Sequence, residues 1–371
     1  MTFCIITHVV HIKKGNHYYG YAPYVNEMNI WLKYVDKVIV VAPLQDQEVN
    51  SIHTFYDHPN IEFVTVPKFS LIGLKNGLKT LFLLPLLFFK IIQSMRKSNH
   101  IHLRCPGNMG LLGSLAQMFF PSKNKTAKYA GNWDMQSKQP QTYVWQKKIL
   151  SSTLLTKNCK VLVYGEWSNQ SKNVYPFFTA TYLNSQIEDL AVKSFASGIK
   201  FLFVGTLSKG KQPQYAIDLV RKLKSKGFDV SLDIYGDGLL KDQLCLSISE
   251  TKSDGFIALK GNVTKEEMIA NYKEAHFLLL PSLSEGWPKV VAEAMFWNCL
   301  PVATPVSCIS TMLDHQNRGI ILNLDLDSDV TSLIEHINDF EFYQKKINLA
   351  SNWSHQFTID KFEQEIKKML A

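Results

Sequence analysis

The chain has 371 residues, of which 46% are hydrophobic and 19% are charged. This length exceeds one ordinary hydrophobic core, and the composition excludes a disordered protein. The net charge of +8 is unevenly shared, because residues 1–190 carry 20 Lys and Arg against 10 Asp and Glu, whereas the remainder has 20 against 22. A basic half favours a polyanionic partner, either nucleic acid or an anionic membrane surface. No helix-turn-helix, zinc-finger or RNP pattern is found, so we expect no nucleic acid.

The cysteines and the first residues bear on the cellular compartment. None of the six cysteines forms a CxxC or other paired spacing, which is typical of reduced core residues in a cytosolic protein. The opening sequence MTFCIITHVV begins as a strand and has no basic region ahead of it, so no secretory signal is expected. We therefore predict a cytoplasmic protein.

Apolar runs alternate with helical patterns along residues 1–190, which we expect to form a first domain. Such alternation predicts an α/β fold in which strands and helices build a doubly wound sheet. The predicted strands are 2–9, 37–41, 61–66, 100–103, 125–130 and 160–163.

Segment 78–97 of this domain is open to two interpretations. Its apolar core, residues 81–89, is too short to span a bilayer, contains Pro85 and is followed by Lys90, Arg96 and Lys97. It could lie in the interface of an anionic membrane as an amphipathic helix, or it could be a buried helix of the domain. Nearby lysines favour a peripheral membrane contact.

The second predicted domain covers residues 198–335 and repeats the alternation of strands and helices. The polar stretch 184–198 is the expected linker. Ligands bind such sheets at the carboxyl ends of the strands, so two of these domains are expected to face a central cleft. The predicted strands are 201–204, 231–235, 257–259, 277–280 and 300–303.

Residues 276–304 carry the most informative pattern of the chain. A buried strand is followed by a loop and by Pro288, which suits the first position of a helix. The N–H groups of Lys289 and Val290 would then be unpaired donors at a helix N-terminus, where a diphosphate is favoured. Glu285 and Glu293 would flank this phosphate site, where each carboxylate could accept hydrogen bonds from a pair of sugar hydroxyls. The arrangement predicts a site for a nucleotide-sugar.

The Glu285 to Glu293 segment resembles the donor site of family 4 glycosyltransferases, which are retaining enzymes of the GT-B fold with a Glu, seven residues, Glu motif. Residues 201–210, 231–238 and 257–263 resemble the strands and loops of the same donor domain in the family's order. The resemblance implies two Rossmann-like domains, with the donor on the second and the acceptor on the first. It also implies that Glu293 binds ribose, that Glu285 binds the donor sugar, and that helix 358–370 returns to the first domain.

The predicted donor site departs from the family at two places. Thr206 stands where the family has an arginine, although Lys211 matches the lysine of that loop, and Trp287–Pro288 replaces Phe-Gly. We assign catalytic roles to Arg104, Lys211 and Glu285. The predicted donor-binding residues are Gly205, Thr206, Gly236, Asn262, Val263, Gly286, Trp287, Pro288, Lys289, Val290 and Glu293.

The first domain is less typical of the family. Where many members have His, one residue, His at a strand end, this chain has His102 and Arg104. A guanidinium there could replace the charge missing at Thr206, or Arg104 could be paired structurally with a carboxylate. The tyrosine-rich loop 15–24 and the loop 131–134 could hold the acceptor or could be surface loops. The predicted acceptor-binding residues are His102, Tyr18, Tyr19, Asn132 and Trp133.

The function implied is retaining transfer of a sugar from a nucleoside diphosphate to a hydroxyl of a carbohydrate or lipid-linked acceptor, in polysaccharide or glycolipid assembly. No cofactor and no metal are expected, and the acidic triplet 325–327 is predicted to be structural. A sugar-nucleotide 2-epimerase and a non-catalytic nucleotide-sugar-binding subunit remain alternatives. A nicotinamide oxidoreductase is least supported, because the glycines 107, 110 and 113 have the wrong spacing for a dinucleotide fingerprint.

Overall fold

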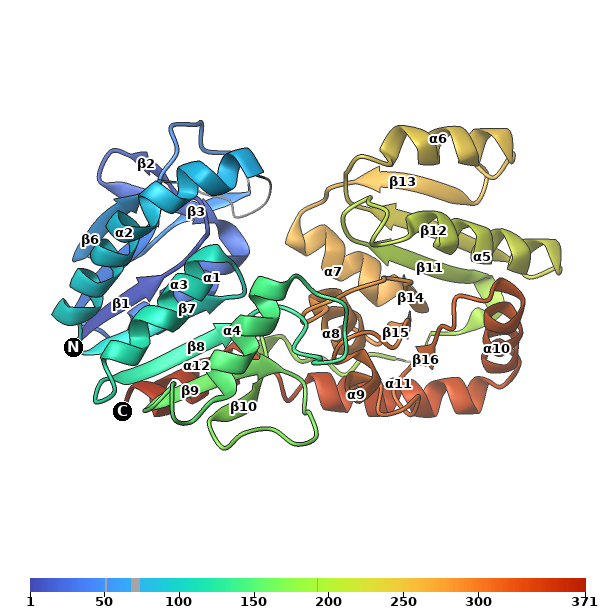
Figure 1. Ribbon diagram of the computed structural model, residues 1–371. Coiled ribbons are helices and arrows are strands. Elements are labelled where there is room, and N and C mark those ends of the chain that lie inside the picture. Colours follow the sequence, from blue (N-terminus) through green and yellow to red (C-terminus); the bar gives the residue numbers. More distant parts are fainter. Residues whose placement is uncertain (51, 68–73, 192) are drawn as a thin grey trace. The chain divides into compact units, whose positions relative to one another are not determined.

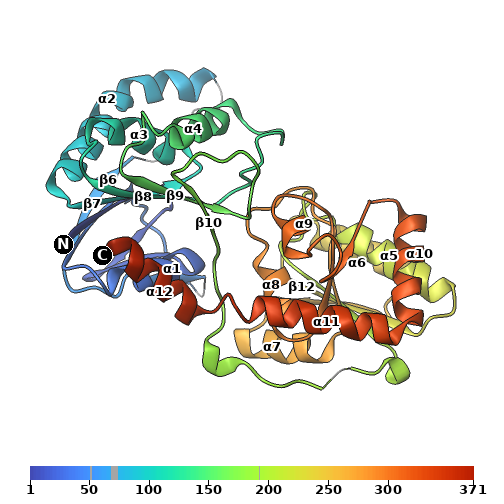
Figure 2. The ribbon, with the colours of Figure 1, turned by 90° about the horizontal axis from the view of Figure 1, so that it is seen from below.

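The computed structural model describes residues 1–50, 52–67, 74–191 and 193–371, with the side chains of 74–82 left out. The chain forms two compact units. Unit 1 consists of Met1–Phe178 together with Phe362–Ala371, and unit 2 consists of Thr179–Lys361. Residues 179–190, expected at the end of the first domain, thus lie in unit 2. Each unit has a parallel sheet covered by helices on both faces, which is the predicted doubly wound architecture (Figure 1, Figure 2).

The sheet of unit 1 has seven parallel strands in the order β10-β9-β8-β7-β1-β4-β6. Its central strands are buried, in keeping with apolar runs such as KVIVVAP in β4. All six strands predicted for this domain are present, and β10 is additional. The strands are β1 Thr2–Ile6, β4 Lys37–Pro43, β6 Ile61–Val66, β7 His100–Cys105, β8 Asn124–Tyr129, β9 Cys159–Tyr164 and β10 Val174–Phe177.

Helix α2 contains the segment for which a membrane contact was considered. Leu87, Ile91 and Met95, spaced four residues apart, are fully buried against the sheet, whereas Leu86 and Phe89 are 49% and 57% exposed. Among the described helices, none is long and apolar enough to cross a membrane. The helices of unit 1 are α1 Ala22–Leu32, α2 Leu74–Lys97, α3 Asn108–Ala116, α4 Gln141–Ser151 and the end of α12, Ile359–Leu370.

The C-terminal helix α12 packs on unit 1. Phe362 and Ile366 are buried, and the Glu363 carboxylate accepts hydrogen bonds from the Lys33 ammonium at 3.0 Å and the Tyr34 hydroxyl at 2.7 Å. Figure 2 shows α12 beside α1 on one face of the sheet. The last residues of the chain therefore complete the core of the first unit.

The tyrosine-rich segment 15–24 is not a loop, so that prediction was wrong. It forms strand β3 (His17–Tyr21) and the start of α1, and β3 pairs antiparallel with β2 (Ile12–Lys14) and β5 (His53–Phe55). Aromatic and β-branched residues pair well across strands, as Tyr19 does with Phe55. The partner β5 lies more than thirty residues away in sequence, and so local patterns did not indicate the sheet.

The sheet of unit 2 has six parallel strands in the order β13-β12-β11-β14-β15-β16, and all five predicted strands are among them. The strands are β11 Ile199–Val204, β12 Val230–Tyr235, β13 Ile257–Gly261, β14 Phe277–Leu280, β15 Leu300–Ala303 and β16 Ile320–Ile321. The helices are α5 Pro213–Ser225, α6 Lys241–Glu250, α7 Lys265–Glu274, α8 Lys289–Phe296, α9 Ile309–Met312, α10 Leu326–Asn338 and α11 Phe340–Ser354.

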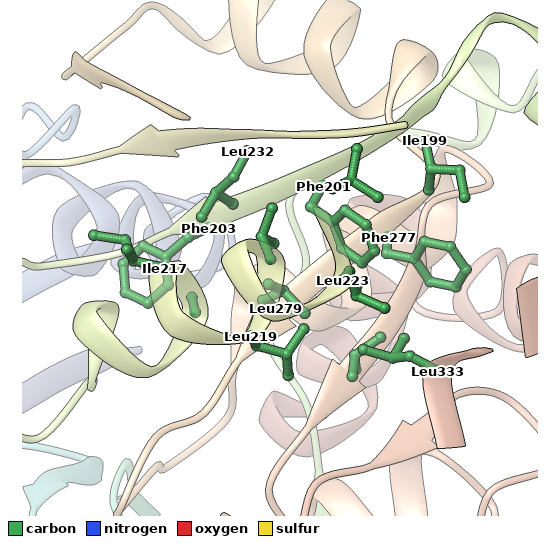
Figure 3. Close-up of a cluster of buried hydrophobic side chains, with 14 of the residues drawn as sticks. Ile199, Phe201, Phe203, Ile217, Leu219, Leu223, Leu232, Phe277, Leu279 and Leu333 are labelled. Carbon is green, nitrogen blue, oxygen red and sulfur yellow. The ribbon is translucent and has the colours of Figure 1, made fainter. Parts of the chain in front are cut away.

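The core of unit 2 explains why the carboxyl ends of these strands meet at one edge. Alternate side chains of the central strands, such as Phe201, Phe203 and Leu279, are fully buried against Leu219 of α5 and Leu333 of α10 (Figure 3). Burying one such side chain stabilises the fold by about 1.5–3 kcal/mol. Because this packing fixes the register of the parallel strands, the loops that follow them are brought together at one edge of the sheet.

Candidate functional site

The loops that follow the strands of the unit 2 sheet are in close backbone contact at its carboxyl edge. The Gly205 N–H donates to the Tyr235 carbonyl at 3.0 Å, and the Gly236 N–H donates to the Gly261 carbonyl at 2.8 Å. A Cβ atom on Gly236, whose φ is +132°, would lie 2.0 Å from the Gly205 carbonyl oxygen. Glycine is therefore required at Gly236 for the close approach of the two loops.

Three other residues predicted at this edge lie in the same loops. Thr206 and Asn262 are exposed, and Val263 is half-buried. The Thr206 carbonyl accepts the N–H of Ser208 at 2.9 Å, which turns the loop toward Lys211. Both polar side chains are thus open to a ligand at this edge.

Lys211 and Glu285, predicted separately, form an ion pair. The Glu285 side chain is 8% exposed and that of Lys211 is 28% exposed. Their loops are also joined by the backbone, because the Leu283 N–H donates to the Gly210 carbonyl at 2.8 Å. Ion pairing in such a sheltered position is much less screened than at the surface. The structure thus brings a cation and a carboxylate together from segments 74 residues apart.

Glu293 lies on α8 and is held by two hydroxyl groups. Its Oε1 accepts a hydrogen bond from Thr181 Oγ1 at 2.8 Å, and its Oε2 accepts one from the Tyr272 hydroxyl at 3.4 Å. Burial, and then the negative charge of Glu293, raises the pKa of Tyr272 well above its usual value. Burial lowers the pKa of Lys265, and the Glu293 carboxylate opposes this shift. Thr181 and Tyr272 were missed by the sequence analysis, and no local pattern marks them.

The N-terminus of α8 differs from its prediction in one respect. Pro288 is the residue before the helix rather than its first residue, and the Lys289 N–H donates to the Trp287 carbonyl at 2.9 Å. The prediction that the Lys289 N–H is unpaired was therefore wrong, because the turn at Trp287 supplies an acceptor. No partner of the Val290 N–H is found among the described residues. One of the two predicted donors is available.

The loop before α8 is fixed by residues that the sequence analysis did not select. The Gly286 carbonyl accepts from Ser307 Oγ at 3.0 Å and from the Cys308 thiol at 3.3 Å. Trp287, predicted to bind the donor, stacks on Trp353 of α11 with 6.3 Å between ring centroids. These contacts hold the backbone that carries Glu285.

Arg104 of unit 1 is paired with a carboxylate, as the structural alternative proposed. Its Nη1 lies 3.2 Å from Glu27 Oε1, and the Lys128 ammonium lies 3.0 Å from the same oxygen. Arg104 also lies over the Tyr24 ring, 5.3 Å from its centroid. Two cations thus share the Glu27 carboxylate at the carboxyl ends of β7 and β8, and these three side chains together carry a formal charge of +1. Glu27 and Lys128 were not predicted.

His102 lies in the core of unit 1. Its side chain is fully buried, and Nδ1 lies 2.8 Å from Thr126 Oγ1. Burial lowers its pKa well below the usual value, with smaller effects from His100 and Arg104. The placement does not support the prediction that His102 contacts the acceptor, because alternate residues of a buried strand point into the core.

The other predicted acceptor residues differ in how deeply they are buried and in what they contact. Trp133 is 4% exposed and packs against Tyr129 in the core, which again does not support a substrate contact. Asn132 is half-buried and accepts the Asp134 N–H at 2.9 Å. Tyr18 stacks on Phe63 with centroids 4.4 Å apart, and Tyr19 packs against Phe55. Asn132, Tyr18 and Tyr19 keep part of their surface exposed.

The acidic triplet 325–327 has the predicted structural role. Asp325 accepts the N–H of Ser328 at 2.8 Å and caps α10, and Asp327 pairs with Lys222. The Lys222 ammonium, as the first cause, lowers the pKa of Asp327.

Comparison with known proteins identifies the second half of the chain. Residues 187–354 match the family model described as glycosyl transferases group 1. This segment is similar to group 1 glycosyltransferases. The match covers the whole candidate site of unit 2, from Gly205 to Glu293, and confirms the glycosyltransferase resemblance, whereas the family 4 subclass stays a prediction.

Two curated relatives are from Campylobacter jejuni. One, an α-1,4-N-acetyl-D-galactosaminyltransferase named for a diphospho-undecaprenol-linked saccharide, is 26% identical over 182 residues, which are 48% of this chain and 49% of that protein. The other, a 4-α-N-acetylgalactosaminyltransferase also named for such a saccharide, is 31% identical over 146 residues, 39% of this chain and 37% of that protein. The chain thus spans half or less of the length of these relatives.

A solved structure extends the likeness to the whole chain. The Anabaena protein HepE in complex with UDP has a TM-score of 0.69 and 15% identity, and the alignment covers 100% of this chain and 98% of that chain. At this identity the likeness concerns the fold alone. The two Rossmann-like units have the GT-B fold, as predicted.

Proposed function

We propose that the protein is a retaining glycosyltransferase that moves a sugar from a nucleoside diphosphate to the hydroxyl of an acceptor. The observation that carries this proposal is the ion pair of Lys211 and Glu285 near the N-terminus of α8, the helix that carries Glu293, within the segment that matches the group 1 glycosyl transferase model. Cation, carboxylates and an open N–H group at one sheet edge suit a ligand that combines phosphate with sugar hydroxyls.

In this proposal the two carboxylates bind different parts of the donor. Glu293 would accept hydrogen bonds from the ribose, in place of those from Thr181 and Tyr272. Glu285 has two oxygens, so it can hold the Lys211 ammonium with one and a donor-sugar hydroxyl with the other. Lys211 would thereby be positioned by Glu285 for the diphosphate.

The chemical step is a substitution at the anomeric carbon. The bond from that carbon to the oxygen of the distal phosphate breaks, a bond to the acceptor oxygen forms on the same face, and the acceptor proton passes to the departing phosphate. The growing charge on the phosphate would be stabilised by Lys211, by the Val290 N–H and by the dipole of α8. We also assign Arg104 to this charge and treat the reaction as metal-independent.

The acceptor is proposed to be a carbohydrate or a lipid-linked saccharide. The names of both Campylobacter relatives contain a diphospho-undecaprenol-linked saccharide, and unit 1 belongs to the basic half of the chain. Asn132, Tyr18 and Tyr19 are partly exposed and are proposed to contact this acceptor. A cytoplasmic protein with a peripheral membrane contact through 78–97 would meet such a substrate, and the exposed Leu86 and Phe89 are available for that contact.

The decisive experiment offers the purified protein a panel of sugar nucleotides and measures release of free nucleoside diphosphate. We expect one donor to be hydrolysed slowly, and faster once a suitable acceptor is added, with the new linkage keeping the anomeric configuration. Conversion of the donor to its epimer without an acceptor would instead identify an epimerase. Tight binding of a donor with no release under any condition would identify a non-catalytic subunit, and oxidation of a nicotinamide would overturn the proposal entirely.

A further inference from the structure

A second pocket lies in unit 1, at the amino ends of β7 to β10, the edge of the sheet opposite to Arg104. Its volume is about 550 Å³, which is in the range of small-molecule sites. Among the described residues that line it, none has an acidic side chain and five are lysines. These are Lys125, Lys157, Lys160, Lys172 and Lys368.

The five lysines differ in whether their ammonium groups have an ion-pair or hydrogen-bond partner. The Lys125 ammonium is buried and donates to the Phe120 carbonyl at 2.7 Å, and Lys368 pairs with Glu365 at 2.9 Å. Lys157, Lys160 and Lys172 are exposed, and no ion pair or hydrogen bond of their ammonium groups occurs within the described part of the chain. Three lysines without an ion pair in the described part of the chain therefore line one hollow, together with the last residue, Ala371.

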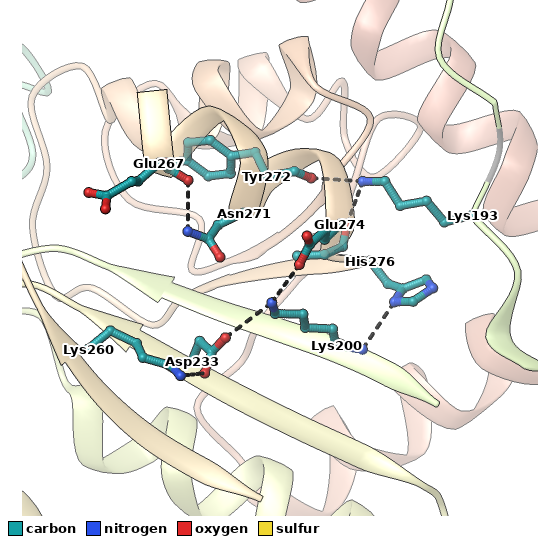
Figure 4. A network of polar contacts seen from close by, with 10 residues as sticks. Lys193, Lys200, Asp233, Lys260, Glu267, Asn271, Tyr272, Glu274 and His276 are labelled. Carbon is teal, nitrogen blue, oxygen red and sulfur yellow. Dashed lines mark hydrogen bonds and ion pairs between the residues drawn. The ribbon is translucent and has the colours of Figure 1, made fainter. Parts of the chain in front are cut away.

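Unit 2 provides an internal comparison, because a pocket of about 620 Å³ lies at the same edge of its sheet. There the lysines are compensated: Lys200 pairs with Asp233 at 3.2 Å and with Glu274 at 3.1 Å (Figure 4). Two further lysines of that pocket have acidic partners, namely Lys224 with Asp229 and Lys273 with Glu188. The same fold thus balances its charges at this edge in one unit and leaves them unbalanced in the other.

The unbalanced charge has an effect inside unit 1. Burial, and then the charge of Lys160, lowers the pKa of His100, a lining residue, to about 4. Like charges without partners repel each other. The ammonium groups of Lys123 and Lys125 donate to backbone carbonyls at the ends of helices on this edge of the sheet, namely those of Met95 and Phe120. Lys157, Lys160 and Lys172 have no such carbonyl among the described residues, and a bound anion would offset their charge.

We infer that this pocket binds a ligand that carries a phosphate group. Lysine ammonium groups bind phosphate as point charges, and Asn124 and Thr153 line the same pocket with amide and hydroxyl donors. The volume exceeds that of a phosphate ion, which leaves room for a further part of the ligand beside the phosphate. The phosphate can come from a membrane lipid headgroup or from a free phosphorylated compound.

The test compares the triple variant Lys157→Gln, Lys160→Gln and Lys172→Gln with the unchanged full-length protein. Binding of inorganic pyrophosphate is measured by calorimetry, and binding to phosphatidylcholine vesicles with about 30 mol% phosphatidylglycerol is measured by sedimentation. We expect at least one of these affinities to fall by about tenfold or more, since each lysine near an anionic surface contributes noticeably. Pyrophosphate bound elsewhere on the chain is the same in both proteins, so the difference reports on the pocket.

A matched control removes the same charge outside the pocket, through Lys14→Gln, Lys138→Gln and Lys148→Gln, which are exposed lysines of the same unit. Loss of pyrophosphate binding in the pocket variant alone assigns the site to a free phosphorylated compound, and loss of vesicle binding alone assigns it to a lipid headgroup. Equal behaviour of the two triple variants in both assays, with unchanged thermal unfolding, would overturn the inference.

Discussion

Glu293 is the residue whose proposed role is easiest to separate from catalysis. Its carboxylate already accepts two hydroxyl hydrogen bonds, from Thr181 and Tyr272, and ribose hydroxyls would replace them with the same geometry. Hydrogen bonds to a charged acceptor contribute roughly 1.5–3 kcal/mol each. Such an interaction is expected in both the ground state and the transition state.

For Glu293→Ala we therefore expect the donor KM to rise by about tenfold to a hundredfold, while kcat changes little. Steady-state kinetics with the donor found in the screen will measure both constants. Glu250→Ala, at the exposed end of α6, is the matched control and is expected to leave both unchanged. A loss of kcat without a change in KM would remove Glu293 from ribose binding.

For Lys211 we expect the reverse, namely that its replacement affects kcat more than the donor KM. Its ammonium is held by the largely buried Glu285 carboxylate, and the charge on the departing phosphate grows only as the reaction proceeds. We expect Lys211→Met to lower kcat by roughly a hundredfold or more and to affect donor KM less. Lys209→Met, an exposed lysine in the same loop, is the control. Equal kcat values for the two variants would mean that the Lys211–Glu285 pair is structural.

At the scale of elements, α8 depends on contacts at both ends. Its N-terminus forms part of the candidate site, and its C-terminal carbonyls at Trp297 and Asn298 accept from the Lys193 ammonium, 2.8 Å from the Asn298 oxygen. The same ammonium donates to the Tyr272 carbonyl at 2.8 Å and to that of Ala275, at the end of α7 (Figure 4). The Lys193 ammonium therefore lies at the C-termini of both α7 and α8, where each helix dipole has its negative end.

Replacing Lys193 by Met keeps the aliphatic stem and removes the cation from four carbonyl groups. We expect the free energy of unfolding of unit 2 to fall by about 2–4 kcal/mol, because buried carbonyls lose a charged donor. Urea denaturation gives the energy, and hydrogen exchange should show faster opening at the ends of α7 and α8. Lys226→Met, an exposed lysine after α5, should change neither. An intact exchange pattern in Lys193→Met would contradict the role in joining the helices.

For the whole molecule, buried histidines make unit 1 sensitive to acid. Burial lowers the pKa of both His11 and His100 to about 4, and it lowers that of His102 well below the usual value. In the unfolded chain a histidine is protonated near pH 6.5, whereas His11 and His100 of folded unit 1 are protonated only near pH 4. Stability contributed by the neutral histidines is therefore present above pH 6.5 and lost as the pH falls from 6.5 to 4.

We expect this loss to reach on the order of 3 kcal/mol for each of His11 and His100 at pH 4. Hydrogen exchange of the β1 and β4 amides between pH 7 and pH 4.5 will measure the opening of unit 1. His100→Gln can still hydrogen-bond Thr126 and should make the pH dependence shallower, whereas His315→Asn, an exposed site in unit 2, should not. Identical slopes in the two variants would show that His100 does not contribute.

Features that depend on neighbouring residues could be predicted from the sequence. Apolar runs such as Phe277–Leu280 predicted the buried parallel strands, and the loop and proline before Lys289 predicted a helix start between the two glutamates. These features follow from local backbone preferences and side-chain periodicity, which a short stretch of sequence contains in full. The helix start was misplaced by one residue at Pro288, and the one wrong element type was segment 15–24, where strand β3 depends on pairing with the distant β5.

Contacts between groups that are far apart in sequence could be seen only in the folded chain. Arg104 pairs with Glu27 from 77 residues away, and Thr181 holds Glu293 from 112 residues away. His102 was expected to contact the acceptor, but its side chain lies in the core. The pocket of unit 1 combines Lys157 and Lys172 of two loops with Lys160 of β9. Burial, pairing and charge balance depend on the packing of the complete sheet, and no local pattern of residues contains that information.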